Sequence, residues 1–335
     1  MSEATDAAKV SPELKIKREE MSPLYLHAAK TSERAQRNFF LLLGIELVML
    51  PLAVLIGSFN GIVTEIGPVS LVTPPFPLGP FHIPALSYFQ ITEAVLLVFA
   101  LVARMIRFIA RPEILWYEAR AVAESVKSLA WRYMVGGEPF QEALSDDALN
   151  AVVTDRFQHI RTDLSRYKAP DEVAERHWIT PEMRAIRKES LAARKRLYRE
   201  QRVQNQLDWY TRNAQSNRVR WFNMHSGIIV IEALASVAAL LPLGLAAIHL
   251  FPLNLQSVAT NVAGSGAAWM QAKRYEDLNA SYRVTAKELK KVDATIARQE
   301  NETDEAAWAR LVENVEGSMS REHQLWRATR IDTDE

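Results

Sequence analysis

Cysteine is absent from the 335 residues, and glycine is scarce, with 12 residues in the whole chain. Without cysteine the protein has no disulfide, no thiolate metal site and no cysteine nucleophile. Few glycines favour helices over a turn-rich β architecture. The formal net charge is zero, but this average hides a segregation of apolar and charged residues into separate blocks.

Sequence signatures of enzymes are also lacking. The seven histidines are His27, His82, His159, His177, His225, His249 and His323. They are scattered and form no His-Glu-x-x-His arrangement, so no metal site is predicted. The segment Gly264-Ser265-Gly266 lacks the third glycine and the preceding strand of a phosphate-binding loop. We therefore expect no catalytic residues, no cofactor and no enzymatic activity.

The two ends of the chain are polar. Residues 1–20 lack the short apolar core of a cleavable signal peptide, and they are predicted to form a disordered tail. Residues 331–335 are predicted to be a frayed C-terminus. Insertion into a membrane would then depend on the first apolar segment itself.

Four apolar segments stand out, and in the first, residues 38–57, Glu46 is the one charged residue. A helix rises about 1.5 Å per residue, so about twenty residues cross a hydrocarbon core of about 30 Å. The other three segments are residues 86–109, 223–244 and 252–270. The pattern predicts an all-α integral membrane protein with four transmembrane helices arranged as two hairpins.

Lys and Arg gather at one end of every apolar segment, whereas the hairpin loops 58–85 and 246–251 contain none. Lys30, Arg34 and Arg37 precede the first segment, the second ends in Arg104, Arg107 and Arg111, and Lys273 and Arg274 follow the fourth. Positively charged loops stay in the cytoplasm. We therefore predict a multi-pass membrane protein with both termini and the middle segment in the cytoplasm.

Each hairpin is followed by helices with a narrow apolar stripe at alternating steps of three and four residues, which suits coiled-coil-like packing. The first stripe is Leu115, Ala119, Val122, Val126, Leu129 and Tyr133; the second is Leu149, Val153, Phe157, Ile160, Leu164 and Tyr167; the third is Tyr275, Leu278, Tyr282, Thr285, Leu289, Val292 and Ile296. A helix from Pro181 is predicted to continue unbroken to Arg220, and a last helix to begin near Thr303.

The chain contains a sparse internal repeat. Glu46 and Glu232 occupy similar places in the first and third segments, and Tyr117-Glu118 and Tyr275-Glu276 each begin a stripe after the second and fourth. The Pro-rich loop 58–85 accounts for the greater length of the first copy. The predicted units are residues 21–168 and 169–330, each with two membrane helices and the helices that follow them.

Three passages carry a resemblance to a known family. They are Trp116-Tyr117-Glu118-Ala119-Arg120 with Glu124, Lys127 and Trp131-Arg132-Tyr133; Tyr275-Glu276-Asp277-Leu278 with Tyr282 and Glu288-Leu289; and Val315-Glu316 with Glu322 and Trp326. In this order around two hairpins, they resemble the SLATT group of two-transmembrane effector domains. The resemblance implies a bacterial inner-membrane effector in conflict or defence responses, which acts by pore formation or membrane perturbation. It also implies a homo-oligomer triggered by a nucleotide sensor or nucleotidyltransferase partner.

The intramembrane carboxylates Glu46, Glu93 and Glu232 are the first candidate site. An ionised side chain at mid-membrane costs about 2.5–3.5 kcal/mol, so such residues face an interior or an aqueous path. One interpretation is a titratable, cation-attracting pore lining. The other is that each glutamate holds neighbouring helices together through a hydrogen bond.

Polar residues in the fourth segment are the second candidate. Asn254, Ser257 and Asn261 recur at helical spacing among small residues. Amides lining water would suit an ion path opposite the glutamates. Tight packing between helices is the alternative.

A basic helix is the third candidate. Its cations include Arg184, Arg187, Lys188, Arg194, Lys195, Arg196 and Arg199. They would contact anionic lipid or a nucleotide messenger, or else form a solvated face that enforces topology. No recognition fold for nucleic acid accompanies them. The two functional hypotheses are therefore an oligomeric, gated membrane pore and a non-conducting scaffold that presents cytoplasmic helices to a partner.

Overall fold

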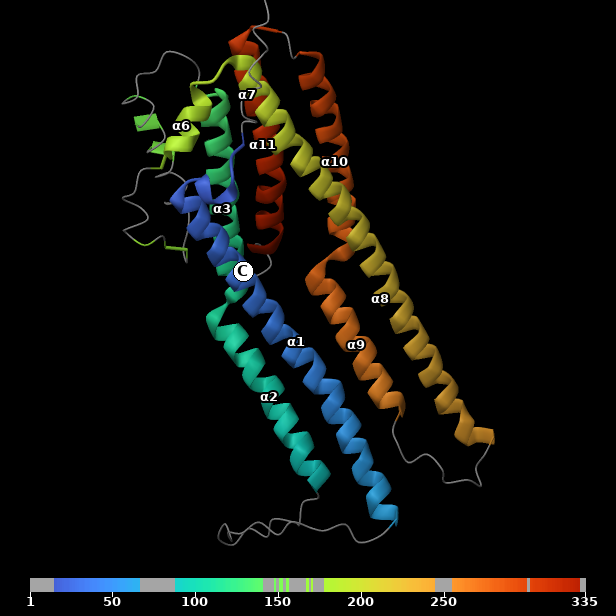
Figure 1. Cartoon of the computed structure of the whole chain (residues 1–335). Coiled ribbons are helices and arrows are strands. Elements are labelled where there is room, and N and C mark those ends of the chain that lie inside the picture. The colour runs from blue at the N-terminus through green and yellow to red at the C-terminus, as the bar shows by residue number, and fades with distance from the viewer. Residues whose placement is uncertain are drawn as a thin grey trace, which may run out of the picture. The chain divides into compact units, whose positions relative to one another are not determined.

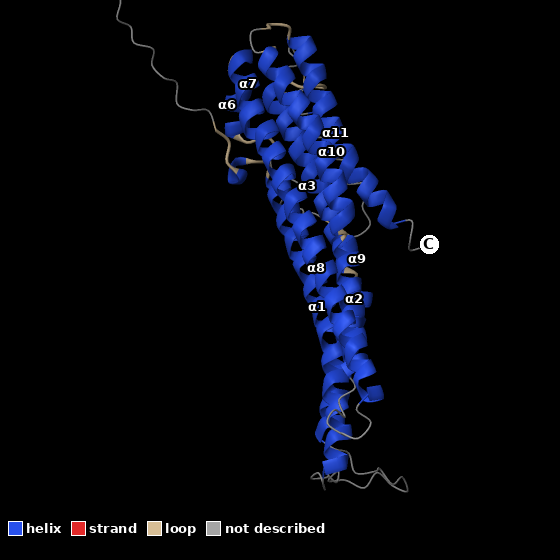
Figure 2. Cartoon of the chain, turned by 90° about the vertical axis from the view of Figure 1, so that its right-hand side faces the viewer, coloured by secondary structure: helices blue, strands red, loops and turns tan. Residues whose placement is uncertain are grey.

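The computed structural model describes residues 15–66, 88–140, 148, 151–152, 155–156, 167–168, 170, 178–244, 255–299 and 302–331. Within these ranges every regular element is a helix and none is a strand, as the colouring of Figure 2 shows. The all-α prediction is confirmed for this part of the chain. Most of the predicted tail, the loop at 67–87 and most of the second stripe lie outside the described residues.

The helices divide into two compact units. The hairpin unit consists of residues 37–112 and 213–280, and the bundle unit of residues 1–36, 113–212 and 281–335. Both predicted repeats contribute to both units.

The hairpin unit is built from the later part of α1 (Pro23–Ile66), α2 (Tyr88–Ala110), the later part of α8 (Asn205–Gly244) and α9 (Leu255–Lys273). These helices form a row in the order α2, α1, α9, α8 (Figure 1). The contacts along it are Phe89 stacked on Phe59 with ring centroids 6.1 Å apart, Phe40 against Trp269 at 5.7 Å, and Ile228 against Gly266. The helices α1 and α9 are therefore central, and α2 and α8 are the edges.

One described helix, over Pro23–Phe59, is long and apolar enough to cross a membrane by length and composition, with a mean hydropathy of 2.7 in its most apolar stretch. This criterion supports the first of the four predicted spans and leaves the other three as predictions. The apolar segments predicted at 86–109, 223–244 and 252–270 are nevertheless helical through most of their length.

Both hairpins end in the same way. Arg111 after α2 and Arg274 after α9 have positive φ angles of 41° and 50°. Their backbone N–H groups bind the carbonyls of Arg107 and Met270, which closes the last turn of each helix. A new helix starts directly afterwards in each copy, α3 (Pro112–Val135) and α10 (Tyr275–Arg298). This shared junction adds a structural element to the internal repeat.

The bundle unit contains the start of α1, the 3-10 turn η1 (Arg18–Glu20), α3, α6 (Pro181–Arg187), α7 (Leu191–Leu197), the π-helix η2 (Tyr198–Gln204), most of α10 and α11 (Glu305–Ile331). Its most buried apolar side chains are Leu24, Val122, Val126, Met134, Val135, Phe140, Leu197, Tyr198, Val203, Leu289 and Val312. The predicted stripe of α3 lies in this core, with Ala119 and Val126 fully buried. In α10 the stripe residues Tyr282, Leu289 and Ile296 are buried as well.

The helix α3 ends at two successive glycines, Gly136 and Gly137. Gly136 adopts a left-handed conformation with φ 78°, which a residue without Cβ accepts at little strain. The N–H of Gly137 donates to the carbonyl of Arg132 at 2.8 Å, the bond that ends a helix in a Schellman motif.

The predicted unbroken helix from Pro181 to Arg220 is wrong. It breaks between Arg187 and Leu191, where Ser190 Oγ accepts from the N–H of Ala193 at 3.3 Å and caps α7. A serine that bonds to its own backbone favours a helix start over a helix interior. A π-helical segment then leads into α8, and π-helical turns often occur in functional segments.

Candidate functional site

Glu46 of α1 is not an isolated carboxylate. It is buried, with 7% of its surface exposed, and Arg107 of α2 donates from Nη2 to its Oε2 at 2.5 Å. Arg104 Nε lies 3.8 Å from Oε1, and the Arg107 guanidinium stands 5.9 Å from the ring centroid of Phe39. The carboxylate therefore joins α1 to α2 as an ion pair. Sequence reasoning assigned these arginines to topology and missed their contact with Glu46.

Glu93 of α2 packs against the same helix. A Cβ at Gly57 of α1 would overlap its carboxylate, so the missing side chain makes room for Glu93. Glu93 is half-buried on the side of α2 that faces α1. The structure brings two of the three predicted glutamates to one helix pair, at different levels.

Glu232 of α8 differs from both. Its side chain is exposed, and among the described residues no cation lies within ion-pair distance of its carboxylate. It is flanked by exposed apolar residues such as Ile229 and Leu234, at 56% and 65% exposure. The carboxylate is therefore presented outward from an apolar helix.

The amides of α9 are partly covered. Asn261 and Ser257 are half-buried, and Asn261 Nδ2 donates to the carbonyl of Ser257 at 2.9 Å. This bond leaves the amide oxygen of Asn261 available. Asn254 lies outside the described residues.

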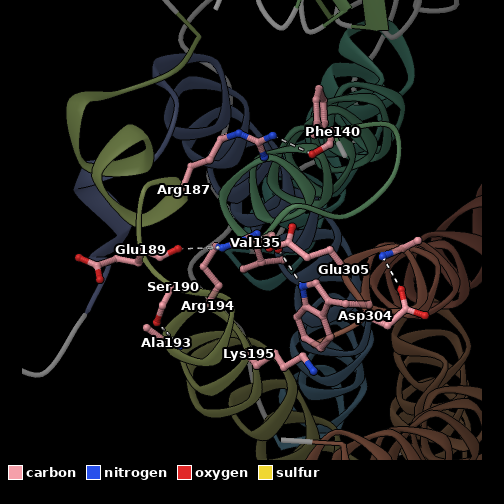
Figure 3. Close-up of polar contacts among 12 residues, drawn as sticks. Val135, Phe140, Arg187, Glu189, Ser190, Ala193, Arg194, Lys195, Asp304 and Glu305 are labelled. Carbon is pink, nitrogen blue, oxygen red and sulfur yellow. Dashed lines mark hydrogen bonds and ion pairs between the residues drawn. The ribbon is translucent and has the colours of Figure 1, made fainter. Parts of the chain in front are cut away.

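Four cations of the predicted basic face bind inside the bundle unit instead, and Figure 3 shows three of them, Arg187, Arg194 and Lys195. Arg187 donates to the carbonyls of Tyr133 and Phe140 at 2.7 and 2.8 Å. Arg194 donates to the carbonyl of Val135 at 3.0 Å and pairs with Glu305 at 2.9 Å. Cations near a helix C-terminus are favoured by the helix dipole, so these arginines hold the end of α3.

Lys195 and Arg199 complete this internal set. Lys195 Nζ donates to the carbonyls of Gln299 and Glu302 in the α10–α11 connection, and Arg199 pairs with Asp293 at 2.8 Å. Lys188 and Arg196 are exposed and Arg184 is half-exposed. A lipid or nucleotide contact of this face would therefore rest on those three residues.

The deepest charge pair of the bundle unit escaped the sequence analysis. Arg202 of η2 forms two hydrogen bonds with Glu316 of α11, Nε to Oε1 at 2.9 Å and Nη2 to Oε2 at 2.7 Å. Tyr198 donates its hydroxyl to the same carboxylate at 2.9 Å. The side chains of Arg202 and Glu316 are 3% and 0% exposed. The π-helix thus supplies both donors to one buried carboxylate.

Electrostatics follows this geometry. Burial raises the pKa of Tyr198 well above its ordinary value, and the charge of Glu316 raises it further. Burial alone would lower the pKa of Arg202, but attraction and hydrogen bonding by Glu316 outweigh it and raise that pKa. The guanidinium of Arg202 therefore stays charged. Nη1 of Arg202 has no hydrogen-bond partner among the described residues.

A small polar pocket opens beside this pair. It is lined by Glu124, Ser128, Arg202, Gln206, Tyr210, Glu316 and Met319. Lys127 lies 3.6 Å from Glu124, and burial lowers the pKa of this lysine although Glu124 opposes the shift. Among the described residues, no cluster of three acidic or histidine side chains is arranged to hold a metal ion.

The aromatic residues of the family-like passages build the core. Trp116 stacks on Tyr117 at 4.8 Å, and Trp131 meets the buried Tyr198 edge-on at 6.0 Å. Tyr282 packs on Tyr210 at 5.3 Å. Tyr275 is buried and Arg120 half-buried, while the side chains of Glu322 and Trp326 lie outside the described ones. The described members therefore act in packing.

His27 near the start of α1 should make stability depend on pH. Its Nδ1 lies 2.9 Å from the hydroxyl of Tyr167, whose N–H donates to Glu118. Burial, followed by the charge of Arg34, lowers the pKa of His27. The unfolded chain then binds a proton more readily, so stability is full above the unfolded pKa of about 6.5 and falls as pH drops toward the folded value. Thermal unfolding of the detergent-solubilised chain should show this loss between pH 7.5 and pH 5.5, with a smaller loss for His27→Gln. Equal losses in both proteins would contradict the prediction.

Two comparisons with family models give the class of the protein. Residues 78–195 match the model of SMODS and SLOG-associating 2TM effector domain 3, and residues 198–326 match that of SMODS and SLOG-associating 2TM effector domain 1. Both describe two-transmembrane effector domains, so the chain is a membrane effector at the level of its class. It carries two SLATT domains in tandem, as its sequence indicated. No curated protein and no solved structure matches the chain.

Proposed function

We propose that the protein is a four-span, non-enzymatic membrane effector whose oligomer forms a gated pore. The observation that carries this proposal is the exposure of apolar side chains along α2 and α8. On α2 they are Val95, Leu97, Val98, Phe99, Leu101, Val102, Met105, Ile106, Phe108 and Ile109; on α8 they are Phe222, Ile229, Val230, Leu234, Val237 and Leu240. Contiguous apolar patches of this extent mark a surface that lipid or another protein covers.

The distribution of charge supports an orientation for the spans. Lys and Arg stand beside α1, α2 and α9 at the ends that lead into the bundle unit, and the loops 58–85 and 246–251 have none. By the positive-inside rule the bundle unit and both termini are cytoplasmic. A trigger received by the bundle unit would then reach the spans through α1 and α8, which each contribute to both units.

Asn261 and Ser257 of α9 are the residues that we assign to the ion path. Glu46 and Glu93 are engaged between α1 and α2, whereas the hydrogen bond of the Asn261 amide to the Ser257 carbonyl stays within α9 and uses the amide nitrogen. Polar groups lining a pore replace part of the hydration of a passing ion. An apolar residue at Asn261 would remove such a polar group and so raise the energy barrier to the passage of an ion.

Purified full-length protein in planar bilayers tests this function. We expect ionic currents, alone or after addition of a panel of cyclic nucleotides, and a several-fold lower conductance for Asn261→Leu. The matched control is Val262→Leu at the same level of α9, which should conduct like the wild type. Absence of current under all these conditions, with the protein correctly inserted, would refute the pore.

The Glu46–Arg107 pair favours a second candidate, a non-conducting scaffold. An ion pair between α1 and α2 gives the carboxylate a role in hairpin cohesion, so the hairpin could serve as an anchor for the bundle unit. Growth arrest on overexpression separates the two. Loss of toxicity in Asn261→Leu with normal insertion supports the pore, whereas unchanged toxicity supports the scaffold.

A further inference from the structure

The row of four helices has two open edges. On α2 most of the covered residues form one stripe, and so do most of those in the apolar part of α8, with half-buried Ile91 and Ser226 as the exceptions. The stripes are Phe89, Glu93, Leu96, Ala100, Ala103 and Arg107 on α2, and Trp221, Met224, Ile228, Ile231 and Ala235 on α8. In α1, by contrast, Val48 is the single exposed residue between positions 42 and 59. Among the described residues, each edge helix therefore packs against one neighbouring helix of the row and presents most of its remaining surface outward.

The two edges carry opposite charges. The side chain of Arg104 on α2 is 71% exposed, and its one ion-pair contact among the described residues is the distant approach of Nε to Glu46 at 3.8 Å. Glu232 on α8 is exposed. Both charges emerge from apolar surfaces, where an ionised side chain without a partner is costly in a membrane.

The two charges lie at neighbouring levels along the helix axes. Trp269 of α9 lies 3.9 Å from the Cβ position of Gly44, and the Cβ position of Gly266, about one turn away, lies 3.1 Å from Ile228. Glu232 is one turn beyond Ile228, and Glu46 is half a turn beyond Gly44. At a rise of about 1.5 Å per residue, Glu232 therefore lies about 7.5 Å, or about one and a half turns, beyond the level of Glu46 along the helix axes, and Arg104 lies beside Glu46.

The directions of the helices agree as well. Phe40 contacts both Trp269 and Lys273, whereas Gly44 contacts Trp269. As the residue number increases along α1, the number of the contacting residue in α9 decreases, so the two helices are antiparallel. Neighbours in the row alternate in direction, and α8 is antiparallel to α2. A second copy placed beside the first continues that alternation.

From these observations we propose that copies of this chain associate head to tail in the membrane, with α8 of one copy against α2 of the next, and that Glu232 pairs with Arg104 of the partner subunit. This proposal rests on the membrane location given above. It buries the apolar edges and gives each exposed charge a partner of opposite sign. Because the two contacting surfaces differ, the contact repeats from copy to copy and closes into a ring where the rotation permits.

Charge reversal tests the pairing. Arg104→Glu and Glu232→Arg should each weaken self-association in lipid nanodiscs about tenfold or more, measured by energy transfer between labelled copies, because like charges then face each other. A one-to-one mixture of the two variants should associate again, since each interface then joins opposite charges. Both replacements in one chain should restore association too. Rescue by the double variant without rescue by the mixture would place the pair within one chain and overturn the proposal.

The absence of cysteine makes cross-linking unambiguous. Phe108 on α2 and Ile229 on α8 are 72% and 56% exposed and lie on the same side of Arg104 and Glu232, toward the bundle unit. Co-expressed chains with Phe108→Cys and Ile229→Cys should form a disulfide-linked dimer upon oxidation. Dimers of Ile229→Cys alone, or no cross-link in the mixed pair despite oligomers, would overturn the arrangement. Neutral variants Arg104→Gln and Glu232→Gln replace the reversals if these fail to insert.

The cross-link and the bilayer currents are independent measurements. Cross-linked chains without current would refute the pore and leave the head-to-tail contact intact. Currents without the mixed cross-link would refute the contact and leave the pore intact.

Discussion

Replacing Glu316 with alanine is expected to lower the free energy of unfolding of the bundle unit by about 3–5 kcal/mol, because it leaves the buried guanidinium of Arg202 without its counter-ion. Both side chains are almost completely removed from solvent, and the carboxylate accepts three hydrogen bonds, two from Arg202 and one from Tyr198. Chemical denaturation of the full-length chain in mild detergent, followed by tryptophan fluorescence, measures the loss. Trp131 and Trp308, which contact Tyr198, report on this core.

Two controls define what the loss means. Asp293→Ala removes the partner of Arg199 in a more exposed pair and should cost at most about 1 kcal/mol. The double replacement Arg202→Met and Glu316→Leu removes both charges and should recover much of the stability lost in Glu316→Ala, since apolar residues replace buried ion pairs at little cost. A single variant as stable as the wild type would show that this pair does not hold η2 to α11.

Replacing Glu46 with alanine should have the second large effect, a loss of about 3–5 kcal/mol in the hairpin unit, because Arg107 then stays between α1 and α2 without a counter-ion. Arg104 is too distant and too exposed to change this result, and it has the same charge as Arg107. Unfolding by sodium dodecyl sulfate in mixed micelles, together with the yield of inserted protein, measures the effect.

Glu232→Ala is the matched control for Glu46→Ala. The two carboxylates lie within about one and a half turns of each other along the helix axes, but Glu232 is exposed, so its removal should change the unfolding of the solubilised monomer by less than about 1 kcal/mol. The paired replacement Glu46→Leu and Arg107→Leu should insert and fold. If Glu46→Ala and Glu232→Ala were equally stable, the ion pair would have no part in hairpin cohesion.

The sequence predicted those features that short-range physics decides. Segment length and apolar content indicated the helices that became α2 and α9. Spacing by three and four residues predicted the buried stripe of α3. Each of these depends on neighbours within about two turns of helix, so the pattern is local and visible in the sequence.

The partners of the charges could not be predicted in this way. Glu46 and Arg107 are 61 residues apart, and Arg202 and Glu316 are 114 apart. Several arginines are near enough along the chain to suit either carboxylate, and periodicity does not choose among them. The break before Ser190 could not be predicted from local sequence either, because Arg187 and Arg194 contact the end of α3 only in the folded bundle.

By itself, then, the sequence determined the helical class, the tandem repeat and the segregation of apolar from charged segments, since these follow from composition and spacing. The tertiary structure alone decided which of three similar glutamates is paired, which is packed over a glycine and which faces outward. A carboxylate is surrounded by whatever folds against it, and that environment is set by helices distant in the chain. For this reason the position of α8 at the edge of the row, which the sequence does not reveal, makes Glu232 a candidate contact between copies.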